Sequence, residues 1–132
     1  MDIPQLLREA RTIAVVGLSD KPERPSYDVA EYLMGHGYTI IPVNPNIHEW
    51  KGLKAHASLR DIPAGAKVDV VDVFRKSEDV PPVVDEAIKI GAGAVWMQLG
   101  IVNEAAAEKA RKAGLFVVMD RCMKIEHMKL GK

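Results

Sequence analysis

The chain has 132 residues, of which 48% are hydrophobic and 27% charged, the balance of an ordinary globular protein. This length is close to the commonest size of a domain, so we expect a single domain over residues 1–132. The 18 basic and 18 acidic residues cancel, which excludes the basic surface of a general nucleic-acid binder. The sequence shows neither a membrane-spanning apolar run nor a secretory signal, so we expect a cytoplasmic protein without a membrane partner.

Short apolar runs alternate with amphipathic stretches along the whole chain. The apolar runs predict strands at Thr12–Gly17, Thr39–Val43, Val68–Phe74, Ala94–Met97 and Leu115–Met119. Their near-continuous apolar character is typical of parallel strands that helices cover on both faces. Residues 45–67 contain Gly52, Pro63 and Gly65 and predict an irregular connection, with room for a small edge strand or a helical turn.

Helices are expected between the strands and at both ends of the chain. The patterns predict a short helix over residues 3–10, a second that Ser26 caps and that Gly35 and Gly37 close, a third from Ser77 to Gly91, a fourth from its cap Asn103 to Gly114, and a last short one after Asp120.

This alternation of strands and helices predicts an α/β protein with a doubly wound, three-layer Rossmann-like fold. We predict five parallel strands in the order 3-2-1-4-5, with the flavodoxin order as the alternative. In either order a ligand binds outside the carboxyl ends of the strands, so the residues that directly follow each strand are the candidates for a site.

The turn after the first strand, GLSDKPERPS, leads to a helix N-terminus and predicts a phosphate-binding loop. A glycine permits close approach of the ligand, while hydroxyls and cations pair with phosphate. The candidates are Gly17, Ser19, Lys21, Arg24, Pro25 and Ser26. The turn matches neither GxGxxG nor GxxxxGK[ST], and a polar turn stiffened by proline is the alternative.

The second and third strands end in polar or charged residues. Asn44 and Pro45 stand where a dinucleotide-binding domain usually has an acid for the ribose, and they suit an adenosine whose ribose carries a phosphate. Phe74 and Arg75 add an aromatic ring and a cation to the same crevice. A plain Asn-Pro turn and a solvated helix entrance are the alternatives.

The last two strand ends offer Gln98 and Gly100, then Cys122. The apolar Trp96 and Met97 favour core packing for at least one of the two, whereas Gln98 and Gly100 suit a thin ligand arm. We expect Cys122 in the first turn of the last helix, beside cations that favour a thiolate and thiol exchange; a buried, inert cysteine is the alternative. The four histidines show no metal-ligand spacing, so no metal is expected.

Five motifs together resemble the small stand-alone CoA-binding proteins of the succinyl-CoA synthetase α-subunit type. They are IAVVGLSDKPERPSYDVAEYL, IIPVNPN, DVVDVFR, AVWMQLGI and VVMDRCMKIEH, and they extend over nearly the whole chain. The resemblance implies that coenzyme A is bound, with its diphosphate at the first loop. Adenosine would then lie near Asn44 and Pro45, flanked by Phe74 and Arg75, and pantetheine would run toward Gln98 and Gly100.

The resemblance extends only to the nucleotide-binding domain of the synthetase, and the sequence shows no catalytic dyad. We therefore expect a carrier, a sensor or a redox-linked protein that binds CoA or a short acyl-CoA, in which Cys122 forms a mixed disulfide with CoA. An NAD(P)-binding oxidoreductase or a regulatory nucleotide-binding domain is the alternative, and the missing GxGxxG counts against it. An exposed Trp50 and an alanine-rich fourth helix leave room for a homodimer.

Overall fold

The computed structural model describes residues 1–131, in which parallel strands alternate with helices along the chain. Seven strands, five α-helices and two short 3₁₀ turns follow one another as α1 Ile3–Glu9, β1 Thr12–Val16, α2 Pro25–Gly35, β2 Thr39–Val43, β3 Glu49–Trp50, β4 Leu53–Lys54, η1 Leu59–Asp61, β5 Val70–Val73, η2 Ser77–Asp79, α3 Val80–Lys89, β6 Ala94–Met97, α4 Glu104–Lys112, β7 Phe116–Val118 and α5 Met123–Met128. No helix in this described part of the chain is long and apolar enough to cross a membrane.

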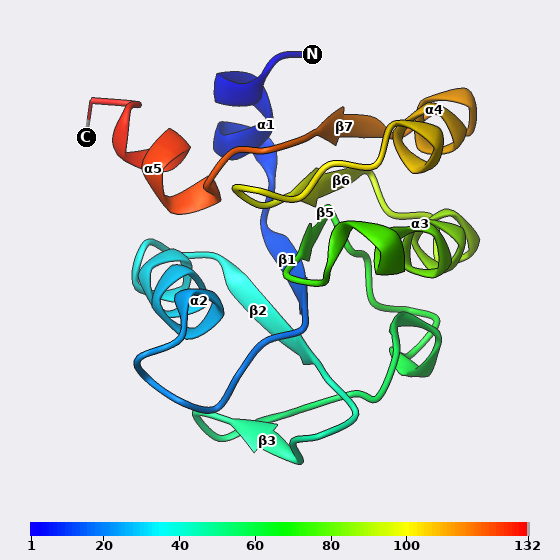
Figure 1. The fold of residues 1–132 in the computed structure, drawn as a ribbon. Coiled ribbons are helices and arrows are strands. Elements are labelled where there is room, and N and C mark those ends of the chain that lie inside the picture. The colour runs from blue at the N-terminus through cyan, green and yellow to red at the C-terminus, as the bar shows by residue number, and fades with distance from the viewer. Residues whose placement is uncertain (132) are drawn as a thin grey trace.

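The sheet is sandwiched between two layers of helices (Figure 1). Helices α1, α2 and α5 cover one face, and α3 and α4 cover the other. Strands β5 and β6 are buried along their whole length, which explains the near-continuous apolar runs in the sequence. The α/β class, the five parallel strands and the doubly wound architecture are therefore confirmed.

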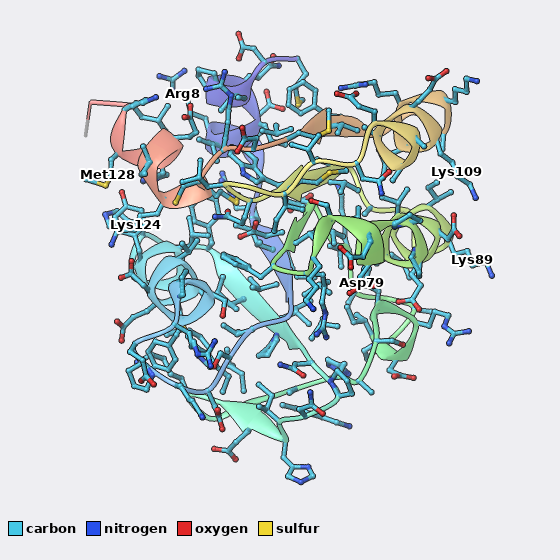
Figure 2. The ribbon with its side chains drawn as sticks, viewed as in Figure 1. Arg8, Asp79, Lys89, Lys109, Lys124 and Met128 are labelled. Carbon is cyan, nitrogen blue, oxygen red and sulfur yellow. The ribbon has the colours of Figure 1, made fainter. Side chains whose placement is uncertain are left out.

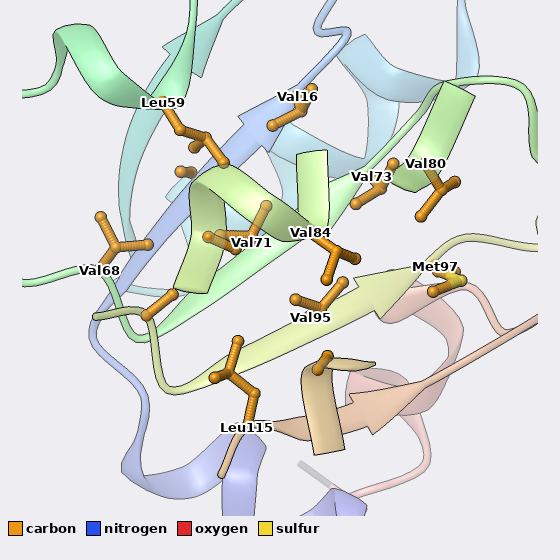
Figure 3. Close-up of a cluster of buried hydrophobic side chains, with 14 of the residues drawn as sticks. Val16, Leu59, Val68, Val71, Val73, Val80, Val84, Val95, Met97 and Leu115 are labelled. Atoms are coloured by element: carbon orange, nitrogen blue, oxygen red, sulfur yellow. The ribbon is translucent and has the colours of Figure 1, made fainter. Parts of the chain in front are cut away.

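Each face of the sheet has its own hydrophobic core. The α3 and α4 side is shown in Figure 3, where Val84 of α3 lies over Val71 and Val95 of the sheet. The small residues of α4, Ala106, Ala107 and Ala110, are part of this core and allow the helix to pack closely. The alanine-rich face is thus already covered within the chain, so it gives no support for a homodimer.

The order of the strands differs from the predicted one. The sheet runs β2-β1-β5-β6-β7, so the third predicted strand pairs with the first and not with the second. The order 3-2-1-4-5 is therefore wrong, and the flavodoxin order is the one observed. Pro42 gives the physical reason, because a residue without an N–H group cannot donate in a ladder and belongs in an edge strand. Strand β2, which contains it, lies at the edge of the sheet.

Two predicted helix starts also need correction. Helix α2 begins at Pro25, with Arg24 as its N-cap residue, so Ser26 lies inside the first turn and is not the cap. Helix α5 begins at Met123, which places Cys122 at the N-cap position and not in the first turn. By contrast, Asn103 does cap α4, where its side chain accepts a hydrogen bond from the Ala106 N–H.

The connection from β2 to β5 carries the small hairpin β3–β4 and the turn η1. Trp50 of this hairpin is only 2% exposed, so the expectation that it is exposed is wrong. Its ring meets Tyr27 of α2 edge to face, with 5.3 Å between the centroids. Trp50 therefore fastens the hairpin to α2 and offers nothing to a second copy of the chain.

Candidate functional site

The carboxyl ends of β1 and β5 lie side by side at the centre of the sheet, where the chain leaves toward opposite faces. Helix α2 follows β1 on one face, and α3 follows β5 on the other (Figure 1). In open α/β sheets, ligands bind at such a switch point, outside the carboxyl ends of the strands. The Val16 carbonyl accepts from the Phe74 N–H at 2.8 Å, and the Gly17 N–H donates to the Val43 carbonyl at 2.8 Å. Gly17 therefore stands between the ends of β2 and β5.

The loop after β1 is folded by its own hydroxyl groups. The Ser19 N–H donates to Ser26 Oγ at 2.9 Å, and the Lys21 N–H donates to Ser19 Oγ at 3.1 Å. Ser26 is buried, and its hydroxyl accepts from the backbone of the loop, so it helps to set the conformation of the loop. Two of the predicted phosphate contacts thus have a structural role that the sequence did not reveal.

Three cations stand around this loop without a carboxylate partner. Among residues 1–131, Lys21, Arg24 and Arg75 form no ion pair, although eight other pairs are present. Lys21 and Arg24 are exposed, and Arg75 is half-buried directly after β5. Unpaired cations beside a switch point are suited to bind a phosphorylated ligand.

Asn44, at the end of β2, holds the same loop from the side. Its Nδ2 group donates to the Leu18 carbonyl at 2.9 Å, and its Oδ1 accepts from the Asn46 N–H at 2.9 Å. The side chain is only 9% exposed, so both ends of the amide are occupied within the chain. Pro45, the next residue, is exposed and is open to a ligand.

The loops after β6 and β7 are tied together. Gln98 Oε1 accepts from the Met123 N–H at 3.1 Å, and Asp120 Oδ1 accepts from the Gly100 N–H at 2.7 Å. Trp96 and Met97 are both fully buried, which confirms core packing for the pair. Gly100 has φ +85°, a conformation that favours glycine. Gln98 therefore anchors the start of α5 and, through it, the position of Cys122.

Cys122 is half-buried at the end of this row of loops. The two neighbouring cations that were expected to favour its thiolate each face a carboxylate. Arg121 lies 3.6 Å from Glu126, and Lys124 lies 3.0 Å from Asp28 of α2, an ion pair whose lysine end is labelled in Figure 2. Their charge is thus shared with these acids, which weakens the predicted environment of the thiol.

One buried residue near the carboxyl end of β5 was not among the predicted site residues. Asp72 of β5 is fully buried, and neither of its carboxylate oxygens has a hydrogen-bond partner in the described chain. It lies in register with Val15 and Trp96, two positions before Phe74. Burial raises the pKa of Asp72 well above its usual value, so a neutral carboxylic acid is favoured. The signal in the sequence was an acid in the middle of a mainly apolar predicted strand, which also contains Asp69.

The match to a known protein family covers most of the chain. The model of the CoA binding domain matches residues 11–128. The chain belongs to this CoA-binding family. The matched range includes every strand-end residue described above, from Gly17 to Cys122. The resemblance to small stand-alone CoA-binding proteins, which the five sequence motifs indicated, is therefore confirmed.

Relatives with this domain occur both alone and inside larger proteins. The uncharacterized protein YneT of Bacillus subtilis is 44% identical over 126 residues, which cover 96% of this chain and 92% of YneT. A solved structure of a hypothetical protein from Pyrococcus horikoshii is 44% identical, with a TM-score of 0.94, and the match covers 99% of this chain and 91% of that one. Its close agreement over nearly the full length supports the strand order found here.

A third relative links the domain to CoA chemistry. The α subunit of an ADP-forming acetate–CoA ligase II from Pyrococcus furiosus is 34% identical over 67 residues. The match covers 50% of this chain but only 15% of the ligase subunit. The similarity is thus confined to a small part of that subunit.

Proposed function

We propose that the chain binds coenzyme A along the carboxyl-end edge of the sheet. The observation that carries the proposal is the group of unpaired cations Lys21, Arg24 and Arg75 around Gly17, at the switch point of a CoA-binding family member. The diphosphate would lie against the loop of residues 17–26, where Gly17 permits close approach of the ligand and Ser19 and Ser26 shape the backbone.

The observed strand order gives the rest of the ligand a direct path. Phe74 and Arg75 lie at the end of the central strand β5, between the phosphate loop and the β6 end. We place adenosine on the side of Asn44 and Pro45 and pantetheine on the side of Gln98 and Gly100. Phe74 and Arg75 then contact the middle of the molecule and not its adenosine end alone.

The role that fits these residues best is a carrier or sensor of CoA or a short acyl-CoA. The ligase relative shares only a small part of its length with this chain, so its activity is not a guide to the function here. The side chains at the strand ends bind and orient. They include no nucleophile hydrogen-bonded to a base among the described residues.

Cys122 adds a redox link to this proposal. Gln98 accepts a hydrogen bond from the N–H of Met123, the residue after Cys122. Pantetheine that ends near Gln98 would therefore bring the sulfur of CoA toward Cys122. The thiolate of Cys122 would attack the disulfide of oxidised CoA, form a protein–CoA disulfide and release one CoA thiolate. The disulfide of oxidised CoA is the oxidant in this exchange, so no other oxidant is needed.

Calorimetric titration with CoA and with NADP tests the binding proposal. We expect CoA to bind and Arg24→Gln and Arg75→Gln each to weaken it about tenfold, the loss typical of one charged hydrogen bond. Arg111→Gln, on the exposed side of α4, is the matched control and should leave the affinity unchanged. Tighter binding of NADP than of CoA would overturn the proposal in favour of an oxidoreductase-like domain.

Incubation with oxidised CoA, followed by mass spectrometry under denaturing conditions that remove reversibly bound CoA, tests the disulfide. An adduct of CoA mass should form, disappear with reductant and be absent from Cys122→Ser, whereas reversible CoA binding by this variant should persist. An adduct that survives reduction, or no adduct despite tight CoA binding, would leave the protein a simple binder.

A further inference from the structure

A cavity lies at the opposite end of the molecule from the strand-end crevice. It has a volume of about 250 Å³ and is lined by residues that include Arg8, Arg11, His36, Tyr38, His127 and Leu130. Arg11 directly precedes β1 and Tyr38 directly precedes β2, so the cavity opens beside the amino ends of these strands. Figure 2 shows Arg8 on α1, on the side toward α5. The cavity is thus separated from Gly17 by the full length of β1.

The lining of this cavity is basic. Two arginines and two histidines face it, and none of the lining residues is acidic. In the described chain neither Arg8 nor Arg11 forms an ion pair. The carboxylate of Asp69 lies beside the backbone of Arg11: its Oδ2 accepts from the N–H groups of Arg11 and Thr12 at 2.8 and 3.0 Å. Its Oδ1 lies 3.8 Å from Lys67 Nζ.

Cations near helix C-termini often serve only to cap the terminal carbonyls. Among the residues that line the cavity, Arg11 and Tyr38 cap such carbonyls. Nη1 of Arg11 donates to the carbonyls of Arg8 and Ala10 at 3.2 and 3.3 Å, and the Tyr38 hydroxyl donates to the Leu7 carbonyl. These bonds use one nitrogen of Arg11 and hold its guanidinium in place, while the other nitrogens remain unbonded within the described chain. Capping therefore orients the Arg11 side chain and occupies only one of its three donor nitrogens.

The imidazoles are held in the same way. His36 Nδ1 lies 2.8 Å from the Tyr32 carbonyl, and His127 Nδ1 lies 2.8 Å from the Tyr32 hydroxyl. The ring of Tyr32 stacks on His36, with 4.1 Å between the centroids. His127 is only 8% exposed, so its imidazole is packed against other side chains on one side of the cavity. His36, which follows α2, and His127 of α5 are far apart in the sequence, yet both imidazoles line the same cavity.

From this arrangement we propose that the cavity is a second binding site, which takes a compact oxyanion of the phosphate class. The guanidinium of Arg11, which hydrogen bonds hold in place, and the charge of Arg8 and Arg11, which form no ion pair among the described residues, are suited to such an anion. A cavity of about 250 Å³ has the volume of about eight waters in the liquid, which suits phosphate or a small phosphate ester and is too small for a nucleotide cofactor. The site is independent of the strand-end crevice and does not need CoA.

Titration with inorganic phosphate at constant ionic strength, followed by ¹H–¹⁵N NMR, tests the proposal. The amides of Gly37 and Leu130, which line the cavity, should shift and saturate. Arg8→Gln should weaken this binding about tenfold or more, Arg8→Lys should restore part of it, and Arg111→Gln should leave it unchanged. The Arg8 side chain makes no hydrogen bond in the described chain, so the variant is expected to stay folded.

Phosphate also has access to the strand-end loop, so the two sites must be told apart. Arg24→Gln should abolish shifts at Gly17 and Ser19 and leave those at Gly37 and Leu130 intact. Shifts at Gly37 and Leu130 that chloride reproduces, that do not saturate, or that ignore Arg8→Gln would overturn the proposal.

Discussion

Gly17 and Phe74 approach so closely that a Cβ atom on Gly17 would lie 2.6 Å from the carbonyl oxygen of Phe74. Gly17 also has φ +89°, which strains any residue with a side chain. The contact joins the first residue after β1 to the first residue after β5, at the switch point of the sheet. The protein's own packing therefore requires glycine at this position.

Gly17→Ala should destabilise the protein for two reasons. The left-handed conformation costs about 1–3 kcal/mol, and the clash with a backbone oxygen adds a similar amount from overpacking. Urea denaturation measures the loss in the free energy of unfolding. Gly37→Ala is the matched control, because Gly37 has φ +97° but open space around it. Equal losses in the two variants would show that the contact with Phe74 adds nothing.

Asn44→Ala should both destabilise the chain and weaken CoA binding. The substitution leaves the buried Leu18 carbonyl without its donor, which costs about 1–3 kcal/mol. It also frees the loop of residues 17–26 on one side, so calorimetry should show weaker CoA binding. Asn46→Ala, in the same turn but exposed, serves as the control for the stability loss. Unchanged CoA affinity in Asn44→Ala would mean that the loop does not need this brace.

The sequence predicts the elements of the fold and the edge of the sheet that carries the candidate site, because apolar runs and helix caps are local signals. All five sheet strands and the cap at Asn103 were found where the pattern placed them, within a few residues. The order of the strands depends partly on which strand lies at the edge of the sheet. Pro42 favours an edge position for β2, whereas the repeating βαβ pattern does not indicate which strand is at the edge.

The side-chain contacts within the site were beyond the reach of the sequence. Asn44 and Gln98 follow strands as predicted, and Ser26 lies at the start of α2, yet each side chain also forms a hydrogen bond to the backbone of another residue. Such bonds join residues between 7 and 26 positions apart in the chain. Only the folded chain shows that these polar groups hold the loops of the candidate site in place.

The stability of the protein should depend on pH through Asp72. Its carboxyl ionises near pH 4 in the unfolded chain, whereas burial raises the pKa in the folded protein well above that. The folded state then holds one more proton, so the free energy of unfolding falls as pH rises from about 4 toward the folded pKa. Below pH 4 the group is neutral in both states and this loss disappears.

Asp72→Val should therefore stabilise the protein at neutral pH by about 1–3 kcal/mol, the range for an unpaired buried polar group. Urea denaturation at pH 7 and pH 4 should show a larger gain at pH 7. Glu78→Gln, on the exposed turn η2, controls for the loss of one acid. A variant less stable than the wild type at both pH values would indicate a hydrogen-bonded, ionised Asp72.

The hydrogen bond from the Met123 N–H to Gln98 Oε1 should control access to Cys122. Helix α5 has no side-chain cap at Cys122 itself, so Gln98 satisfies the first N–H group of this helix from outside. Gln98→Leu removes the acceptor at similar volume and should loosen the start of α5. One net hydrogen bond of about 1 kcal/mol corresponds to roughly fivefold more frequent local opening, and the thiol should react with a disulfide reagent faster by that factor. A wild-type rate in Gln98→Leu would show that the half-buried thiol is reached without any opening of α5.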